Sequence, residues 1–254
     1  MGVNMQNISL SELLKHPEYK QSKAVLPIIV GIDTNNKPFI QDLYKTPHLL
    51  IGGGAGTGKT MFLKSVIHNI QNRYSPKGCD ITVLNPKGID FEKYVDSVTL
   101  INDVDECVQT LQNTLEEMDN RYTLLLKSGA KNILEYNQQN LENQLPFHIV
   151  LIDEISTMIS CFGKKVEQNI IPLAEKARAT GIHLIITSNH FDKISNLFKA
   201  YFPVRMAFWV ATKKDSVRIL GEPGAEKLAT QAEALFSDAG RISILIRTLY
   251  MEKE

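Results

Sequence analysis

The sequence predicts an α/β domain with a mainly parallel central sheet flanked by helices, and three observations carry this prediction. Short apolar runs alternate with amphipathic helical segments along the chain. The run His148-Ile-Val-Leu-Ile152 is almost unbroken, as a strand covered on both faces requires. Residues 53–60 match a glycine-rich phosphate-binding loop between an apolar strand and a helix. We find no linker inside the chain and expect one layered domain.

The first half of the chain supplies two strands, a helix, a third strand and a long helix. The strands at 26–30 and 48–51 are apolar runs bounded by Asn, Pro and Gly. A helix follows Lys59, because apolar residues recur there at three- and four-residue spacing. The run 80–84 predicts the next strand. The same helical spacing over 104–129 predicts one long amphipathic helix that ends near Gly129.

The second half continues the alternation after the strand at 148–152. A helix is expected from about 165 to 180, because the glycine at 181 is a common C-terminal breaker. Further strands, with helical stretches between them, are expected at 182–187, 206–211 and 242–248. This order of elements is typical of a single α/β domain with right-handed crossovers.

Composition and charge limit the classes of partner. The chain has 254 residues, 43% hydrophobic and 22% charged, and Lys plus Arg (28) equals Asp plus Glu (28). A neutral chain is not held to nucleic acid or anionic lipid by bulk charge, so such a partner needs a local patch. Three separated cysteines without a CxxC favour a reducing, cytoplasmic location. No apolar run approaches the roughly 20 residues of a membrane span, so we expect no direct membrane segment.

The segment Gly53-Gly-Ala-Gly-Thr-Gly58-Lys59-Thr60 fits the pattern G-x-x-x-x-G-K-[ST]. Its glycines let backbone N–H groups turn toward phosphate oxygens at a helix N-terminus. Lys59 is expected to reach the β- and γ-phosphates of ATP, and the Thr60 hydroxyl to hold Mg²⁺. The expected nucleotide-binding residues are Gly53, Gly54, Ala55, Gly56, Thr57, Gly58, Lys59 and Thr60. A glycine-rich turn without nucleotide is the bland alternative, and the flanking strand and helix disfavour it.

Polar residues follow two later strands. Asp153 and Glu154 end the strand at 148–152, which places them at the carboxyl edge of the sheet beside the phosphate loop. We expect Asp153 to position Mg²⁺ and Glu154 to polarise the attacking water. Asn189 follows the strand at 182–187 and is expected to contact the γ-phosphate or the water. For the two acids a simple helix cap, and for Asn189 a strand-ending turn, are the alternatives.

Beyond these motifs the chain resembles the motor domain of the FtsK/SpoIIIE-type DNA translocases, which are hexameric RecA-like ATPases that pump double-stranded DNA. The resemblance runs nearly end to end. Segments that carry it include Pro47-His-Leu-Leu50, Gly129-Ala-Lys-Asn-Ile133, Glu175-Lys-Ala-Arg-Ala-Thr-Gly-Ile-His-Leu184 and Gly224-Ala-Glu-Lys-Leu228. It implies a RecA-like P-loop NTPase that uses ATP and Mg²⁺, binds double-stranded DNA and works as a ring of identical subunits, expected to be a hexamer.

The resemblance also implies roles for single residues. Arg178 would reach into the ATP site of the neighbouring subunit, where a cation stabilises charge on the γ-phosphate. His190, Lys199 and Lys213 would face the channel and touch DNA phosphates. The chain departs from the family after the sensor strand, where Ser188-Asn189-His190-Phe191 replaces Thr-Gln-Arg-Pro. A histidine there removes one permanent positive charge, and Asn189 is a shorter amide than glutamine.

The resemblance divides the chain into an N-terminal lead-in helix or segment at 1–24 and an ATPase domain at 25–254. The family's membrane anchor and winged-helix domain have no counterpart, so we expect a bare motor core or a fragment of a longer chain. Two alternatives to DNA translocation stay open. One is a related ATPase of a conjugation or secretion apparatus, with a protein or nucleoprotein cargo and a membrane-channel partner. The other is an ATP-gated assembly module with little hydrolysis.

Overall fold

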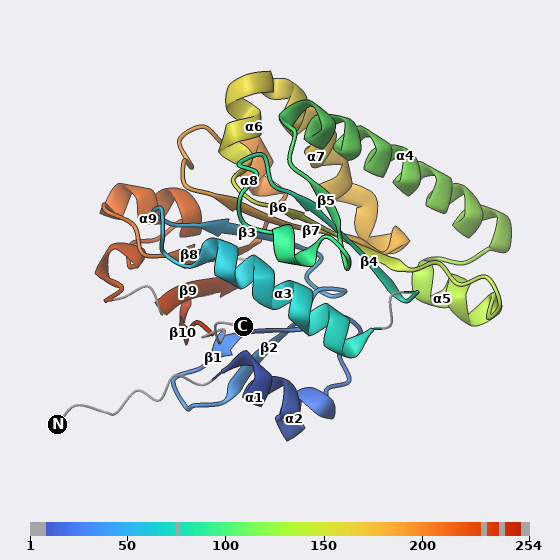
Figure 1. Cartoon of the computed structure of the whole chain (residues 1–254), viewed down its shortest axis with the longest axis horizontal. Helices are drawn as coiled ribbons and strands as arrows, with labels where there is room; N and C mark the ends of the chain where they lie inside the picture. Colours follow the sequence, from blue (N-terminus) through green and yellow to red (C-terminus); the bar gives the residue numbers. More distant parts are fainter. Residues whose placement is uncertain (1–8, 75–76, 230–232, 239–241, 250–254) are drawn as a thin grey trace.

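A single ten-stranded sheet organises the molecule, with its strands in the order β2-β1-β10-β9-β8-β3-β7-β6-β4-β5. The computed structural model describes residues 9–74, 77–229, 233–238 and 242–249. Helices cover both faces of the sheet (Figure 1). The expected α/β class with a mainly parallel central sheet is confirmed.

Six strands form the parallel part of the sheet, and they carry the phosphate loop and the acidic residues. They are β3 (His48–Gly52), β4 (Cys79–Leu84), β5 (Thr99–Ile101), β6 (Phe147–Ile152), β7 (Ile182–Ser188) and β8 (Val204–Phe208). β3 lies between β7 and β8, so the loop that leaves β3 sits in the middle of the sheet's carboxyl edge. Parallel strands of this kind are buried on both faces, which explains their continuous apolar runs.

Four strands extend the sheet beyond β8 in antiparallel pairs. They are β9 (Glu233–Asp238), β10 (Ile244–Arg247), β1 (Pro27–Ile32) and β2 (Pro38–Asp42). The sequence analysis placed no strand at β2, β5 or β9, because each is short and lacks a long apolar run. The strand expected at 206–211 was wrong at both ends. It stops at Phe208 because the Trp209 carbonyl turns to accept the Gly54 N–H, at 2.8 Å.

Helices divide between the two faces of the sheet. α3 (Lys59–Arg73) packs its apolar stripe on one face, next to β1 and β4. The other face is covered by α4 (Val104–Ser128), α6 (Ile155–Phe162), α7 (Lys164–Lys176), α8 (Asn196–Ala200) and α9 (Lys213–Leu220). α5 (Ile133–Gln139) follows α4 (Figure 1). α4 ends at Gly129 with φ 73°, as expected for a left-handed cap.

The helix expected at 165–180 ends earlier than predicted. α7 stops at Lys176, and a 3₁₀ turn, η2 (Ala177–Thr180), leads to Gly181 with φ 77°. Two bonds from α4 hold this end: Tyr122 donates to the Lys176 carbonyl at 2.7 Å, and Arg121 to the Thr180 carbonyl at 2.8 Å. Tertiary bonds therefore take the place of the last helical turn.

The N-terminal segment packs on the antiparallel part of the sheet. α1 (Leu10–Lys15) and α2 (Pro17–Lys20) bury Leu10, Leu13 and Tyr19 against Ile29 and Ile32 of β1. Residues 1–8 of the expected lead-in and 250–254 of the expected domain lie outside the described residues. Short 3₁₀ turns occur at η1 (Glu92–Tyr94) and η3 (Ala225–Lys227). Within the described ranges no helix is long and apolar enough to cross a bilayer.

Candidate active site

The phosphate loop joins β3 to α3 at the carboxyl edge of the sheet. Three of its glycines have positive φ: 154° at Gly53, 71° at Gly56 and 111° at Gly58. Such conformations are unfavourable for residues with a Cβ, which explains the glycines of the motif. Gly53 is also sterically confined, because a Cβ there would lie 2.7 Å from Cβ of Phe208. The backbone therefore forms the phosphate cradle that the motif predicts.

Lys59, the first residue of α3, folds back over this loop. Its Nζ donates to the carbonyl oxygens of Gly53, at 2.9 Å, and Gly54, at 2.6 Å. The side chain is buried, and burial lowers its pKa to about 8 against the opposing effect of the Glu154 and Asp153 charges. The ammonium is therefore held at the mouth of the cradle by carbonyls alone. A polyphosphate would offer it stronger, charged acceptors.

Thr60 and Asp153 lie together, as the sequence predicted. The Thr60 hydroxyl donates to Asp153 Oδ2 at 2.8 Å, and Thr187 of β7 donates to Asp153 Oδ1 at 2.7 Å. Oxygen ligands of this kind suit Mg²⁺, which binds through one or two protein groups, waters and substrate phosphates. No group of three or more His, Cys, Asp or Glu residues that could hold a metal occurs among the described residues. The donor set therefore fits a Mg²⁺ ion shared with ATP.

Glu154 is buried next to Asp153 and has a left-handed backbone with φ 67°. For a residue with a Cβ this conformation costs roughly 1–3 kcal/mol, so other contacts must impose it. One is the bond from the Glu154 N–H to the Thr187 hydroxyl, at 2.9 Å. The carboxylate turns toward the segment after β7, where it accepts the Asn189 N–H and the Ser156 hydroxyl.

Lys87 is the cation nearest to Glu154, and the sequence analysis did not assign it a role. Its Nζ lies 3.5 Å from Glu154 Oε2, with the Lys87 side chain 40% exposed. Thr187, which bonds both acids, was missed as well. The sequence does contain a pattern that could have identified both residues. Lys87 follows β4 and Thr187 lies at the end of β7, and the carboxyl ends of parallel strands meet at one edge of the sheet.

Asn189 follows β7 at the carboxyl edge of the sheet, next to Glu154. Its backbone N–H bonds the carboxylate, and its side-chain Oδ1 is buried without a hydrogen-bond partner among the described residues. Asn189, Lys87, Glu154 and His190 line a pocket of about 210 Å³. This pocket opens beside the acids and can hold water or a phosphate group.

Arg178 lies far from the phosphate loop of its own chain. It belongs to η2, which precedes β7, whereas Ser188 at the other end of β7 pairs with Gly52. The seven residues of β7 span roughly 20 Å. Arg178 Nε donates to the Tyr44 carbonyl at 3.0 Å, and its guanidinium lies 5.8 Å from the centre of the Tyr44 ring. This exposed arginine is at the opposite sheet edge, so it cannot serve the ATP site of its own subunit.

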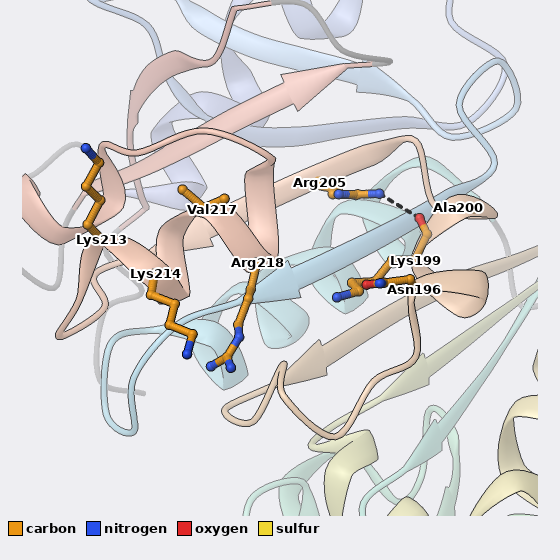
Figure 2. Close-up of a pocket in the computed structure, with 8 residues that line it drawn as sticks. All are labelled: Asn196, Lys199, Ala200, Arg205, Lys213, Lys214, Val217 and Arg218. Atoms are coloured by element: carbon orange, nitrogen blue, oxygen red, sulfur yellow. Dashed lines mark hydrogen bonds between the residues drawn. The ribbon is translucent and has the colours of Figure 1, made fainter.

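The three candidate DNA contacts do not form one surface. Lys199 and Lys213 line a pocket of about 840 Å³ between α8, β8 and α9, whereas His190 lines the smaller pocket beside Glu154. Figure 2 shows the larger pocket, in which the Lys213 side chain points away from Lys214 and Arg218. We call this the basic pocket. Its lining residues are Asn196, Lys199, Ala200, Arg205, Lys213, Lys214, Val217 and Arg218.

The fold and this site define a P-loop NTPase of the RecA-like class. A family model described as "FtsK/SpoIIIE family" matches residues 9–193, and the chain belongs to that family. The protein "DNA translocase FtsK" of Campylobacter jejuni (strain 81-176) is 38% identical over 250 residues, covering 95% of this chain and 26% of that protein. The same-named protein of Rickettsia typhi is 32% identical over 279 residues, covering 93% of this chain and 38% of the relative. The chain therefore spans a minor part of these relatives.

Two solved structures show the same fold. The pCW3 conjugation coupling protein TcpA, with ATPγS, has a TM-score of 0.81 at 27% identity, covering 91% of this chain and 68% of TcpA. The cytoplasmic domain of the type VII secretion ATPase EccC of Thermomonospora curvata has a TM-score of 0.83 at 21% identity, covering 96% of this chain and 32% of EccC. The EccC likeness supports the fold alone.

Proposed function

We propose that this chain is the motor subunit of an ATP-driven DNA translocase. In this proposal it binds ATP and Mg²⁺ at the phosphate loop, hydrolyses ATP in a ring of six subunits, and moves double-stranded DNA. The observation that carries the proposal is the split of the catalytic groups between the two edges of the sheet. The loop, Asp153 and Glu154 occupy one edge, and Arg178 occupies the other. A ring would bring the Arg178 edge of one subunit to the ATP edge of the next.

The residues of one subunit divide the chemistry. Lys59 moves from the carbonyls of its own loop to the phosphates. Thr60 and Asp153 would hold Mg²⁺, which would neutralise charge on the phosphate oxygens. Glu154 accepts a proton from the attacking water. Asn189, with its unpartnered buried Oδ1, contacts the water or reports the γ-phosphate to the segment that follows it. Arg178 of the neighbour stabilises the transferring phosphoryl group.

DNA dependence of ATP turnover tests the proposal. ATPase activity is measured with and without linear duplex DNA at low salt, where phosphate contacts are strongest. We expect duplex DNA to raise turnover at least fivefold, and raised salt to reverse this effect. Turnover that DNA does not change, in a protein that hydrolyses ATP, would remove the translocase assignment.

A second candidate function is an ATPase of a conjugation or secretion apparatus with a protein or nucleoprotein cargo and a membrane-channel partner. The likeness to the conjugation coupling protein TcpA, over two thirds of that protein, favours it. His190 also supports it, because a histidine stands where the resembling family has a permanently charged arginine. Capture of a folded protein partner with ATPγS, together with turnover that duplex DNA does not change, would support this candidate over the first.

A further inference from the structure

The basic pocket gathers positive charge without a counter-ion in its lining. Lys199 comes from α8, Arg205 from β8, and Lys214 and Arg218 from α9 (Figure 2). No acidic residue is among the lining residues, although Asp215 of α9 pairs with Arg218 at 3.2 Å. Burial lowers the pKa of Lys199, and the charges of Arg205 and Arg218 lower it further. An anion in the pocket would relieve this repulsion.

Arg205 is committed to the backbone and frames the pocket. Its guanidinium donates to the carbonyls of Phe202, at 2.9 Å, of Lys199, at 2.7 Å, and of Ile219, at 3.1 Å. The last two bonds tie the ends of α8 and α9 together. Of the other lining cations, Lys213 points away from Lys214 and Arg218 (Figure 2). Lys199, Lys214 and Arg218, the last of which also pairs with Asp215, are therefore the cations assigned to the ligand. Lys214 and Arg218 are one helical turn apart and lie on the same side of α9 (Figure 2).

Ile219 lies between Arg205 of the basic pocket and the end of β3, from which the phosphate loop leaves. Its carbonyl accepts a hydrogen bond from Arg205, as described above, and its side chain packs closely against Gly52, the last residue of β3. A Cβ on Gly52 would lie 2.4 Å from Ile219 Cδ1 and 2.7 Å from Phe191 Cε2. No side chain therefore fits between Ile219, the strand end and Phe191. The next residue, Gly53, carries a carbonyl that binds Lys59.

The start of α9 is tied to the same loop. The Trp209 carbonyl accepts the N–H of Gly54 at 2.8 Å, and the helix begins four residues later at Lys213. The segment that leads into α9 therefore bonds the loop, Ile219 near the end of α9 packs close to the end of β3, and the cations of α9 line the basic pocket. Packed interfaces of this kind shift between discrete arrangements instead of deforming gradually. Movement of α9 would therefore move Gly52 and the loop.

We propose that Ile219 is a positioning residue that couples phosphate binding in the basic pocket to the ATP site, with Lys199, Lys214 and Arg218 binding the backbone phosphates. The inference rests on the proposed function, because its ligand is duplex DNA. Phosphates draw the cations of α9 toward the pocket, and Ile219 carries this movement to Gly52. The loop then releases Lys59 from the Gly53 carbonyl toward ATP.

The Ile219→Val variant tests the coupling, because it deletes only Cδ1, the atom nearest to Gly52. We expect the ratio of DNA-stimulated to basal turnover to fall at least fivefold. DNA affinity should change less than twofold, because Ile219 does not line the basic pocket. Ile170→Val is the matched control, since Ile170 of α7 is fully buried in the same core cluster but is not among the nearest neighbours of Gly52. It should keep the full ratio.

The double variant Lys214→Gln and Arg218→Gln tests the phosphate contacts. We expect weaker binding of linear duplex DNA by at least tenfold, and a smaller dependence on salt by about one unit of slope per lost contact. The double variant Lys127→Gln and Lys131→Gln, at two exposed positions around the end of α4, removes the same two charges and should change neither quantity. A double variant that keeps wild-type affinity and salt dependence would overturn the assignment of this pocket.

The outcomes separate this inference from the function on which it rests. If DNA stimulates the wild type and Ile219→Val equally, the coupling role of Ile219 is wrong and the translocase proposal stands. If DNA does not change the turnover of the assembled wild type, the proposed function is wrong and the coupling falls with it. A loss of stimulation in Ile219→Val and also in Ile170→Val would assign the effect to core packing and contradict the coupling.

Discussion

The backbone N–H of Asn189 lies 3.0 Å from both carboxylate oxygens of Glu154. The expected general base is therefore bound at its two oxygens by the segment expected to sense the γ-phosphate. Ser156 and Lys87 add a hydroxyl and an ammonium to the same carboxylate. In this arrangement Glu154 has little capacity left for water. If Glu154 is the general base, as proposed, the Asn189 segment has to release it before it can accept a proton from water.

Glu154→Gln should keep ATP binding and lose hydrolysis. The amide has nearly the same volume but no basic oxygen, and loss of a general base costs about 10²–10⁴ in rate. Single-turnover ATP hydrolysis and nucleotide affinity, measured on the same preparation, check this. Equal, very slow turnover in the wild type and the variant would contradict a role for Glu154 as base. It would support the alternative of a module whose assembly is controlled by ATP binding, with little hydrolysis.

ATP affinity should fall as pH rises above 8. Burial lowers the pKa of Lys59 to about 8 in the free protein, so the charged form that phosphates bind is lost above that pH. Binding there must recover the proton, and affinity should drop by up to tenfold per pH unit. Calorimetry in two buffers of different ionisation enthalpy measures this proton uptake. Lys59→Ala is the control: it should bind weakly and show no step near pH 8.

Arg178→Ala should spare ATP binding and remove hydrolysis in the assembled protein. An arginine supplied by a neighbour contributes about 10³–10⁵ to the rate of phosphoryl transfer. The control is Tyr44→Phe, which keeps the ring beneath the guanidinium and the backbone carbonyl that Arg178 bonds. Mixtures of wild type and variant should show intermediate turnover. If Arg178→Ala hydrolyses ATP at the wild-type rate, the trans role is wrong.

Acid should destabilise the fold through two buried histidines. His48 and His183 lie at the loop-distal edge of the sheet; burial holds the pKa of His48 well below its usual value and lowers that of His183 to about 3. In the unfolded chain both protonate near 6.5, so the unfolded state gains protons as pH falls and the free energy of unfolding decreases. The slope is up to about 1.4 kcal/mol per pH unit for each histidine.

Urea unfolding at pH 7, 6 and 5 checks this pH dependence. The His183→Phe variant keeps an aromatic ring beside Phe147 and removes one titrating group. Its free energy of unfolding should depend less steeply on pH than that of the wild type. Identical slopes for the two proteins would show that His183 is not the source of the acid sensitivity.

The sequence predicted every parallel strand except β5, although with wrong ends for β8, because burial on both faces leaves a continuous apolar run, as in β6. It did not predict β9, whose residues Glu-Ala-Leu-Phe-Ser-Asp form a strand through pairing with β8 and β10. That pairing depends on partners distant in the chain. The end of β8 likewise depends on the Gly54 bond to Trp209, which no local pattern encodes. Long-range contacts override local preference at these points.

The candidate site divides in the same way. The phosphate loop and the Asp153-Glu154 pair follow from spacing, because backbone conformation and strand ends fix their positions. The contacts of the Glu154 carboxylate with Asn189 and Lys87 do not follow from spacing. They depend on how the ends of β6, β7 and β4 meet in the folded sheet. The basic pocket is also a tertiary feature. Its lining residues lie between 196 and 218, and acidic residues in other parts of the chain offset their positive charge. The net charge of zero therefore gives no sign of this pocket.

The central claim is that one ATP site is completed by two subunits, Glu154 in one and Arg178 in the next. Turnover per subunit, measured against protein concentration on saturating linear duplex DNA with native mass recorded at each point, tests it most directly. We predict that turnover per subunit rises steeply over the concentrations at which the mass changes from monomer to ring, and that Arg178→Ala abolishes this rise. Constant turnover per subunit in a protein that remains monomeric would contradict the claim.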